Sequence, residues 1–176
     1  MTAGAVRRVH VIQGEYHVSD DPNVVLTTIL GSCVAVTVWH PARRLGGMCH
    51  FMLPERLGVR SSGADGRYAT EAIDWLVARM LEHASHPCEY EAKLFGGGRM
   101  FDRAAPAGAD SVGDIHRRNA ATARQLVARH GLQIKGEDLG GHGHRQVMFE
   151  LPNGYAWVRH TPLRPAADPP AAAALA

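Results

Sequence analysis

The sequence has few cysteines, few aromatic residues and no long apolar segment. Its three cysteines among 176 residues lack the paired spacing of a secreted disulfide scaffold, which indicates a reducing compartment. A bilayer-spanning helix needs about 18 consecutive apolar residues, and no such run occurs. The N-terminal segment MTAGAVRRVHVIQGEY also lacks the apolar centre of a signal peptide. We therefore expect a cytoplasmic protein that does not insert into a membrane.

The net charge of the chain is also small. The formal net charge is +2 and the pI is about 8.6. Arginines are scattered, with small pairs at residues 7–8, 43–44 and 117–118 and no dense basic run with interleaved aromatic residues. This pattern does not predict a nucleic-acid partner. The pairs are typical of solvated surface, with contact to an acidic protein partner as the alternative.

The apolar content is sufficient for one substantial core. Hydrophobic residues make up 45% of the chain, which at this length favours one domain. We predict that this domain spans residues 1–160. Residues 161–176 are nearly all Pro and Ala, and we predict that they form a disordered tail.

Hydrophobic periodicity predicts a mixture of strands and helices. Helical spacing of apolar residues predicts amphipathic helices over residues 65–84 and 112–130. Segments rich in Gly, Ser or Pro predict loops at 57–66 and 106–111. Period-two or β-branched segments predict strands over residues 6–12, 24–30, 34–39, 45–53, 93–95, 132–139, 145–151 and 155–159. This order predicts an α+β or layered α/β/α sandwich with a mixed, largely antiparallel sheet and two main helices.

Residues 27–54 are the segment in which the sequence most clearly predicts reactive side chains. The strand that begins beside Cys33 and the strand that contains His50 form a predicted hairpin, with its turn at residues 40–43. With the turn centred after Pro41, the numbers of paired residues sum to about 83, so Cys33 lies directly across from His50. Cys49 then points to the opposite face. A slip of one residue would separate Cys33 from His50.

This pair is typical of a cysteine nucleophile with a histidine base. Gly31 and Ser32 precede Cys33 at a predicted bend, where backbone N–H groups can converge to form an oxyanion site. Thr27 shares the parity of Cys33 if the chain stays extended, and Thr28 is the rival if it does not. Either hydroxyl could orient the imidazole ring. The alternative interpretation is a small buried cysteine beside a histidine with structural partners.

Two further motifs have weaker implications. Gly96, Gly97 and Gly98 follow a short strand, but they lack the spacing of a phosphate-binding loop, so we expect them to permit close backbone approach beside the site. His142 and His144 lack the additional ligands of a zinc site. We expect neither a metal nor a cofactor.

Several segments together resemble one family. These are LTTILGSCVAV, LGGMCHFMLP, RYATEAI, KLFGGGRMF and GEDLGGHGHRQVMFELPNGYAWV, in this order over about residues 10–159. They resemble the chemoreceptor glutamine deamidase family, CheD. Two positions depart from the family pattern: His144 stands where a glycine is usual, and the GxRN motif that contains Asn119 reads GDIHRRN.

The resemblance implies an activity and a set of site residues. It implies a layered α/β/α deamidase fold and a Cys-His-Thr triad at Cys33, His50 and Thr27, because the family's threonine precedes its cysteine by six residues. It also implies that a methyl-accepting chemotaxis receptor is the protein substrate and that a chemotaxis phosphatase is a possible partner. Candidate contacts to a substrate or partner are Phe95, Gly96, Gly97 and Arg145.

The implied reaction is hydrolysis of specific receptor glutamine side chains to glutamate through a thioester on Cys33. Two other classes of protein are compatible with the sequence. One is a non-catalytic chemotaxis adaptor that binds a receptor or the phosphatase. The other is a different cysteine hydrolase, such as a protease or a receptor methylesterase.

Overall fold

A computed structural model describes residues 5–56, 63–100 and 114–163. The loop predicted at 106–111, part of the loop predicted at 57–66, the first residues of the second predicted helix and most of the predicted Pro/Ala tail lie outside these residues. Within them the chain forms two β-sheets and two α-helices.

The larger sheet has five strands in the order β2-β5-β4-β6-β7. Its strands are β2 (Tyr16–Ser19), β4 (Val34–His40), β5 (Leu45–Phe51), β6 (Glu91–Gly96) and β7 (Gln133–Leu139). The smaller sheet has the order β1-β3-β8-β9, with strands β1 (Arg7–His10), β3 (Val24–Leu30), β8 (His144–Glu150) and β9 (Ala156–Thr161). Only the β1–β3 and β6–β7 pairs among these strands are parallel. The predicted mixed, largely antiparallel pairing is therefore confirmed.

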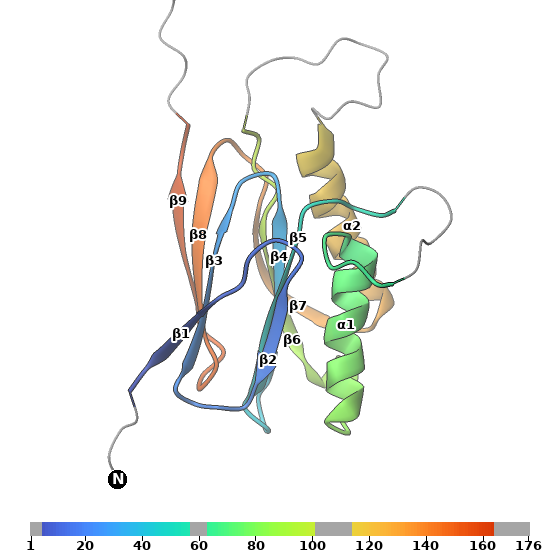
Figure 1. The fold of residues 1–176 in the computed structure, drawn as a ribbon, viewed down its shortest axis with the longest axis vertical. Coiled ribbons are helices and arrows are strands. Elements are labelled where there is room, and N and C mark those ends of the chain that lie inside the picture. Colours follow the sequence, from blue (N-terminus) through green and yellow to red (C-terminus); the bar gives the residue numbers. More distant parts are fainter. Residues whose placement is uncertain (1–4, 57–62, 101–113, 164–176) are drawn as a thin grey trace, which may run out of the picture.

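The elements stack as helices, sheet and sheet (Figure 1). Helices α1 (Ala69–Glu82) and α2 (Ile115–Arg129) both pack on the five-stranded sheet, and the short 3-10 helix η1 (Pro87–Glu89) follows α1. The α+β class, the layered sandwich and the two main helices are as predicted. The outer layer opposite the helices is the four-stranded sheet, where an α/β/α arrangement would place a helix.

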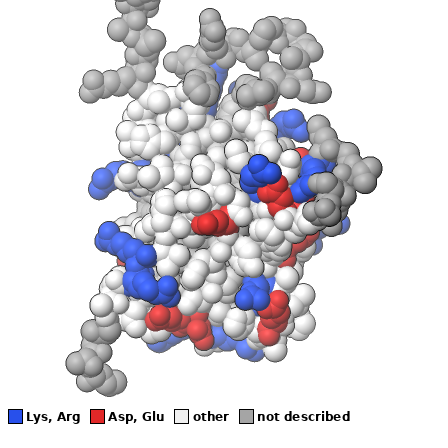
Figure 2. All heavy atoms as spheres, in the orientation of Figure 1, with Lys and Arg blue, Asp and Glu red and all other residues white. Residues whose placement is uncertain are grey.

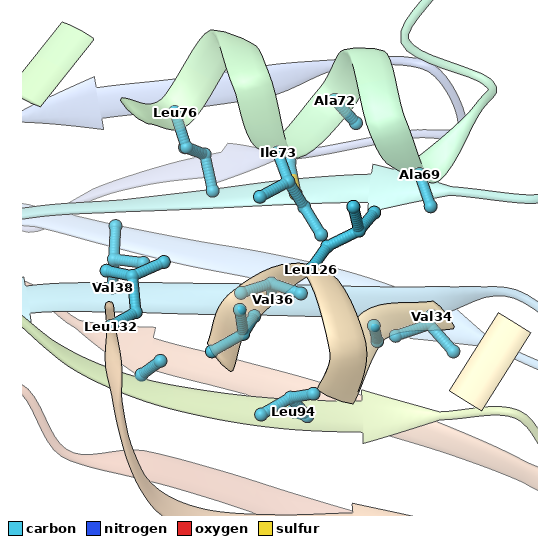
Figure 3. Close-up of a cluster of buried hydrophobic side chains, with 14 of the residues drawn as sticks. Val34, Val36, Val38, Ala69, Ala72, Ile73, Leu76, Leu94, Leu126 and Leu132 are labelled. Carbon is cyan, nitrogen blue, oxygen red and sulfur yellow. The ribbon is translucent and has the colours of Figure 1, made fainter. Parts of the chain in front are cut away.

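The helix-side core explains why these two segments are helical. In α1 the buried apolar residues recur at helical spacing, at Ala69, Ala72, Ile73, Leu76 and Met80. They meet Val34, Val36 and Val38 of β4 and Leu126 of α2, as Figure 3 shows. This packing holds both helices on one face of the sheet.

The second core lies between the sheets. Strand β5 is buried at all seven positions, because the helices cover one of its faces and the smaller sheet covers the other. Cys49 belongs to the helix-side cluster, whereas Met48 and Ala35 belong to the cluster between the sheets. The prediction that Cys49 faces away from His50 is therefore confirmed.

The predicted register of the hairpin is wrong by two residues. Ala35, not Cys33, pairs with His50, so the paired numbers sum to 85. The cause is the turn, because β4 continues to His40 and the four connecting residues are 41–44. A shift of two keeps the same face of the strand. Cys33 accordingly stays on the side of the sheet that carries His50, two residues beyond its direct partner.

Candidate active site

Cys33 lies in the bend between β3 and β4, and neighbouring elements hold this bend in place. The carbonyl of Gly31 accepts a hydrogen bond from the Gly98 N–H (2.8 Å), and the carbonyl of Cys33 accepts one from the Gly97 N–H (2.8 Å). From α2, Asn119 Nδ2 donates to the carbonyl of Ser32 at 3.0 Å. Hydrogen bonds from the glycine run on one side and from α2 on the other therefore hold the backbone around Cys33, the predicted nucleophile.

The glycine run allows this close approach, as predicted. Gly96 has φ of 109°, and a Cβ at this position would lie 2.2 Å from the carbonyl oxygen of Cys33. A side chain there would therefore displace the nucleophile backbone. Gly97, with φ of 60°, continues the same contact.

His50 reaches from β5 into the space between the sheets, where its ring contacts Thr28 and Val11. Thr28 Oγ1 lies 2.7 Å from the Val11 carbonyl oxygen and 2.9 Å from His50 Nδ1. A carbonyl can only accept, so the single hydroxyl proton of Thr28 goes to Val11. The Thr28 oxygen then accepts from Nδ1–H of His50. This network assigns the tautomer of His50 with its proton on Nδ1.

The other ring nitrogen of His50 is available as a base. His50 Nε2 is buried and has no hydrogen-bond partner in the part of the chain that the structure describes. Since Nδ1 carries the proton, Nε2 presents a lone pair. Cys33 packs against the same inter-sheet cluster, at the diagonal position of the hairpin, where backbone positions are about 7–8 Å apart. Both side chains therefore lie on the side of the hairpin that faces the space between the sheets.

The threonine assignment requires a correction. Thr27 Oγ1 contacts His10 Nδ1 at 3.2 Å and the Val9 carbonyl at 3.4 Å, so Thr27 faces away from His50. Strand β3 stays extended through Leu30 and buries alternate residues. Thr28 therefore points between the sheets, and the bend at residues 31–33 removes the parity that related Thr27 to Cys33.

Burial shifts the pKa values of Cys33 and His50 toward their neutral forms. Burial raises the pKa of the Cys33 thiol, and N–H donors from its own backbone and from the Gln13 side chain partly oppose this. Burial lowers the pKa of His50 below its ordinary value, although the Val11 carbonyl acts in the opposite direction. Cys49 is fully buried, and its pKa is raised to about 12. The resting pair is thus a thiol and a neutral imidazole.

The four candidate contact residues lie behind the site. Phe95 is 5% exposed and packs in the inter-sheet core, and Arg145 is 3% exposed. Arg145 donates to Asp138 Oδ1 through Nε (3.0 Å) and Nη2 (2.8 Å). Gly96 and Gly97 are buried as well. Gly96 and Gly97 support the bend at Cys33, whereas Phe95 and Arg145 lie in the interior and not on a surface open to a partner.

Two residues of the site carry no strong signal in the sequence. Asn119 is fully buried and donates to the Met52 carbonyl at 2.9 Å in addition to Ser32. Its place in the GxRN-like motif was the available signal. Gln13 is the second, and its side chain acts to lower the pKa of Cys33 against the effect of burial. A single glutamine in a short loop forms no pattern, so the sequence offers no signal for it.

The surface and the other candidate sites add little chemistry. In residues 5–56, 63–100 and 114–163, no group of three or more metal-ligating side chains comes together. The described helices are all too short or too polar to cross a bilayer. Figure 2 shows acidic and basic side chains interspersed over one face of the molecule.

A test of the threonine assignment compares Thr28→Val with Thr27→Val. The first variant removes the acceptor of His50 Nδ1–H. We expect it to lower kcat about tenfold, since a hydrogen bond to a group that becomes charged contributes about 1.5 kcal/mol. The second variant is the matched control and should change kcat less than about twofold. Steady-state rates of the two variants provide the measurement. A larger loss of kcat in Thr27→Val than in Thr28→Val would show that Thr27 orients the His50 ring.

The comparisons with known proteins converge on one family. The family model described as CheD chemotactic sensory transduction matches residues 52–160, a segment that starts after Cys33 and His50. The probable chemoreceptor glutamine deamidase CheD of Pseudomonas savastanoi pv. phaseolicola (strain 1448A / Race 6) is 49% identical over 143 residues, covering 78% of this chain and 76% of its own.

Two relatives from other bacteria cover more of the chain. The probable chemoreceptor glutamine deamidase CheD of Rhizobium meliloti (strain 1021) is 42% identical over 156 residues, covering 88% of this chain and 81% of its own. The probable chemoreceptor glutamine deamidase CheD 3 of Dechloromonas aromatica (strain RCB) is 39% identical over 153 residues, covering 87% of each.

Proposed function

The chain belongs to the CheD family, and on this premise we propose that it is a protein-glutamine deamidase acting on chemoreceptors. The observation that carries the proposal is the tautomer of His50. Its Nδ1–H is used by Thr28, and its unpartnered Nε2 lies on the face of the hairpin that carries Cys33. An unprotonated ring nitrogen on the same face as a thiol is the arrangement that a general base for a cysteine nucleophile requires.

The first half of the reaction forms a thioester. Nε2 of His50 takes the thiol proton as Cys33 Sγ bonds to the side-chain carbonyl carbon of the substrate glutamine. The carbonyl π electrons move to oxygen, and the backbone N–H groups of Ser32 and Cys33 are the proposed donors to this oxyanion. When the oxyanion collapses, the C–N bond breaks, and His50 returns its proton so that ammonia leaves.

Water then completes the reaction. Nε2 of His50, neutral again, removes a proton from the attacking water, and the C–S bond breaks as the glutamate carboxylic acid forms, which then releases its own proton to solvent as the carboxylate. The sulfur leaves with a proton from His50, which restores the thiol and the imidazole. Thr28 keeps the ring in one orientation while it is charged.

We extend the proposal to location and partners. The substrate is the helical region of a methyl-accepting chemotaxis receptor, in which each conversion makes a new methylatable glutamate. The protein then works in the cytoplasm, where this region lies. A chemotaxis phosphatase is a further proposed partner.

An ammonia-release assay tests this function and separates its rivals. Wild type, Cys33→Ala and the exposed-cysteine control Cys88→Ala are incubated with a cytoplasmic chemoreceptor fragment. We expect wild type and Cys88→Ala to release ammonia and Cys33→Ala to release none above background. Methanol release would indicate a methylesterase and peptide release a protease. No product of any kind, with receptor binding retained in Cys33→Ala, would indicate an adaptor.

The pH dependence follows from the two pKa shifts. His50 must be neutral to accept the thiol proton, and its lowered pKa keeps it neutral down to pH values below about 6.5. Since the pKa of Cys33 is raised, the thiol persists through neutral pH. We expect kcat/KM to be flat through neutral pH and to fall on the acid side of about pH 6.5. A profile that rises steadily from pH 6.5 to 9 would instead require a preformed thiolate.

A further inference from the structure

The outward face of the four-stranded sheet is an exposed surface that the proposed reaction does not use. In Figure 1 both helices lie on the other side of the molecule from this sheet. Alternate residues of each strand point away from the core, and in β3 these are Val25, Thr27 and Ile29. A layered α/β/α protein buries such a face under a helix of its own. In the part of the chain that the structure describes, the face is open to solvent.

An apolar stripe crosses the middle of this outer face. Thr27 pairs with Met148, and Met148 pairs with Trp157, so these three side chains lie in one row across β3, β8 and β9. Ile29 is 51% exposed and Trp157 is 58% exposed. Together with Met148 they line a hollow of about 560 Å³. Exposed apolar side chains that adjoin one another are typical of an interaction surface.

Positive charge flanks the stripe at both edges of the sheet. Arg8 lines the hollow from β1, and Arg159 lines it from β9. Both side chains are exposed, and neither guanidinium pairs with a carboxylate of another described residue. Glu150 shares this face, and its Oε1 accepts from Trp157 Nε1 at 3.1 Å. The outer face therefore fits a partner that is apolar along its middle and acidic on its flanks.

An amphipathic helix has this shape and this charge pattern. Its apolar residues form one stripe along its length, and carboxylates can lie on either side of that stripe. A helix with its side chains is about 10–12 Å wide, and four strands about 4.8 Å apart span about 14 Å. A single helix therefore fits between Arg8 and Arg159, with its apolar stripe on Met148.

Strand β3 connects the outer face to the nucleophile. Ile29 points outward near the end of this strand, and Thr28 points inward to His50. Cys33 follows Ile29 by four residues, in the bend at which β3 ends. A helix on the outer face thus reaches the edge of the sheet at which a substrate glutamine has to be presented.

We propose that the outer face, with Ile29, Met148 and Trp157 at its centre and Arg8 and Arg159 at its edges, docks an acidic amphipathic helix of the protein substrate. The inference rests on the proposed function, because that function supplies a helical receptor segment as the substrate. Docking at this face holds the receptor through a segment other than the one that contains the reacting glutamine.

The test measures binding of a cytoplasmic chemoreceptor fragment to the full-length Cys33→Ala chain by isothermal titration calorimetry, so that no turnover occurs. In this background, the double variant Arg8→Glu, Arg159→Glu should raise Kd at least about tenfold, because like charges then face each other across the interface. Trp157→Ala should raise Kd about tenfold, since it removes the aromatic anchor. Added salt should weaken binding by the Cys33→Ala parent more than binding by the double variant.

A matched control and a measurement of assembly keep the result readable. Arg129→Glu makes the same charge change on the exposed surface of α2, and its Kd should equal that of the parent. Sedimentation of the parent should show a monomer. A dimer that Trp157→Ala converts to monomers would show that a second copy of this chain covers the face, and would overturn the inference.

Failure of the docking surface and failure of the proposed function are distinguishable. An unchanged Kd in either the double variant or Trp157→Ala, or no binding by the parent while wild type releases ammonia, would overturn the docking surface. Binding that depends on Arg8 and Arg159, without ammonia release by wild type, would overturn the deamidase function and leave the docking surface in place. Absence of both binding and ammonia release would overturn both.

Discussion

His50→Ala should lower kcat for ammonia release by about a thousandfold, since general acid and base catalysis contributes about 10²–10⁴ to rates. The reason is that, in the proposed mechanism, one imidazole accepts the thiol proton, protonates the leaving ammonia and activates water. KM should change little, because Nε2 acts only as bonds are made and broken. Steady-state rates over a range of receptor-fragment concentrations provide the measurement.

Two further variants keep this result interpretable. His50 is buried, with 1% of its surface exposed, so His50→Ala also leaves a cavity and removes the donor to the Thr28 oxygen. His50→Gln fills more of the space and retains a donor for Thr28, yet it offers no comparable base. The kcat of His50→Gln should fall as far as that of His50→Ala, whereas its melting temperature should be closer to that of wild type. The exposed His83→Ala is the control. Retention of more than about a tenth of kcat in His50→Gln would rule out the base role.

Asn119→Ala should lower the free energy of unfolding by about 2–4 kcal/mol. Asn119 is fully buried and donates to two carbonyls, those of Ser32 and Met52. Removing it takes the donor from two partly buried acceptors, and a buried polar group without a partner costs about 1–3 kcal/mol. Urea unfolding measures the change, with Gln125→Ala on the exposed face of the same helix as the control.

The same variant should also impair catalysis below its unfolding midpoint. Ser32 directly precedes the nucleophile, and Asn119 is the link from α2 to this bend. Loss of the link permits misplacement of Cys33, and small misplacements can lower rates about 10²-fold. An Asn119→Ala enzyme as stable and as active as Gln125→Ala would show that the Gly97 and Gly98 contacts alone hold the bend.

Local patterns in the sequence were sufficient for most elements. Residues 24–30 were predicted with the bounds that β3 has, because a β-branched run is limited by polar turn residues on one side and a glycine on the other. Strand β2 was missed, since its four residues lie at a sheet edge between Gly14 and a polar turn. The layer order was also missed, because strand periodicity does not reveal which sheet a strand joins.

The sequence predicted the site as far as the alternation of side chains along a strand determines which face of the sheet a residue occupies. Cys33 and His50 share a face even though the register was wrong by two residues, since a shift of two preserves the face. Which threonine contacts His50 depends on Val11. This residue lies in the loop between β1 and β2, and its carbonyl accepts the Thr28 hydroxyl proton. Gln13, whose side chain acts to lower the pKa of Cys33, lies in the same loop. Such contacts arise from tertiary structure, and the spacing of residues near Cys33 does not encode them.

The most direct test of the central claim is intact and peptide mass spectrometry of a cytoplasmic chemoreceptor fragment after incubation with the enzyme. With wild type, we expect specific glutamine-containing peptides to gain the mass that replacement of an NH₂ group by an OH group gives. The same peptides should stay unchanged with Cys33→Ala. An unchanged fragment with wild type, or equal conversion with Cys33→Ala, would contradict the assignment of Cys33 as the nucleophile of a glutamine deamidase.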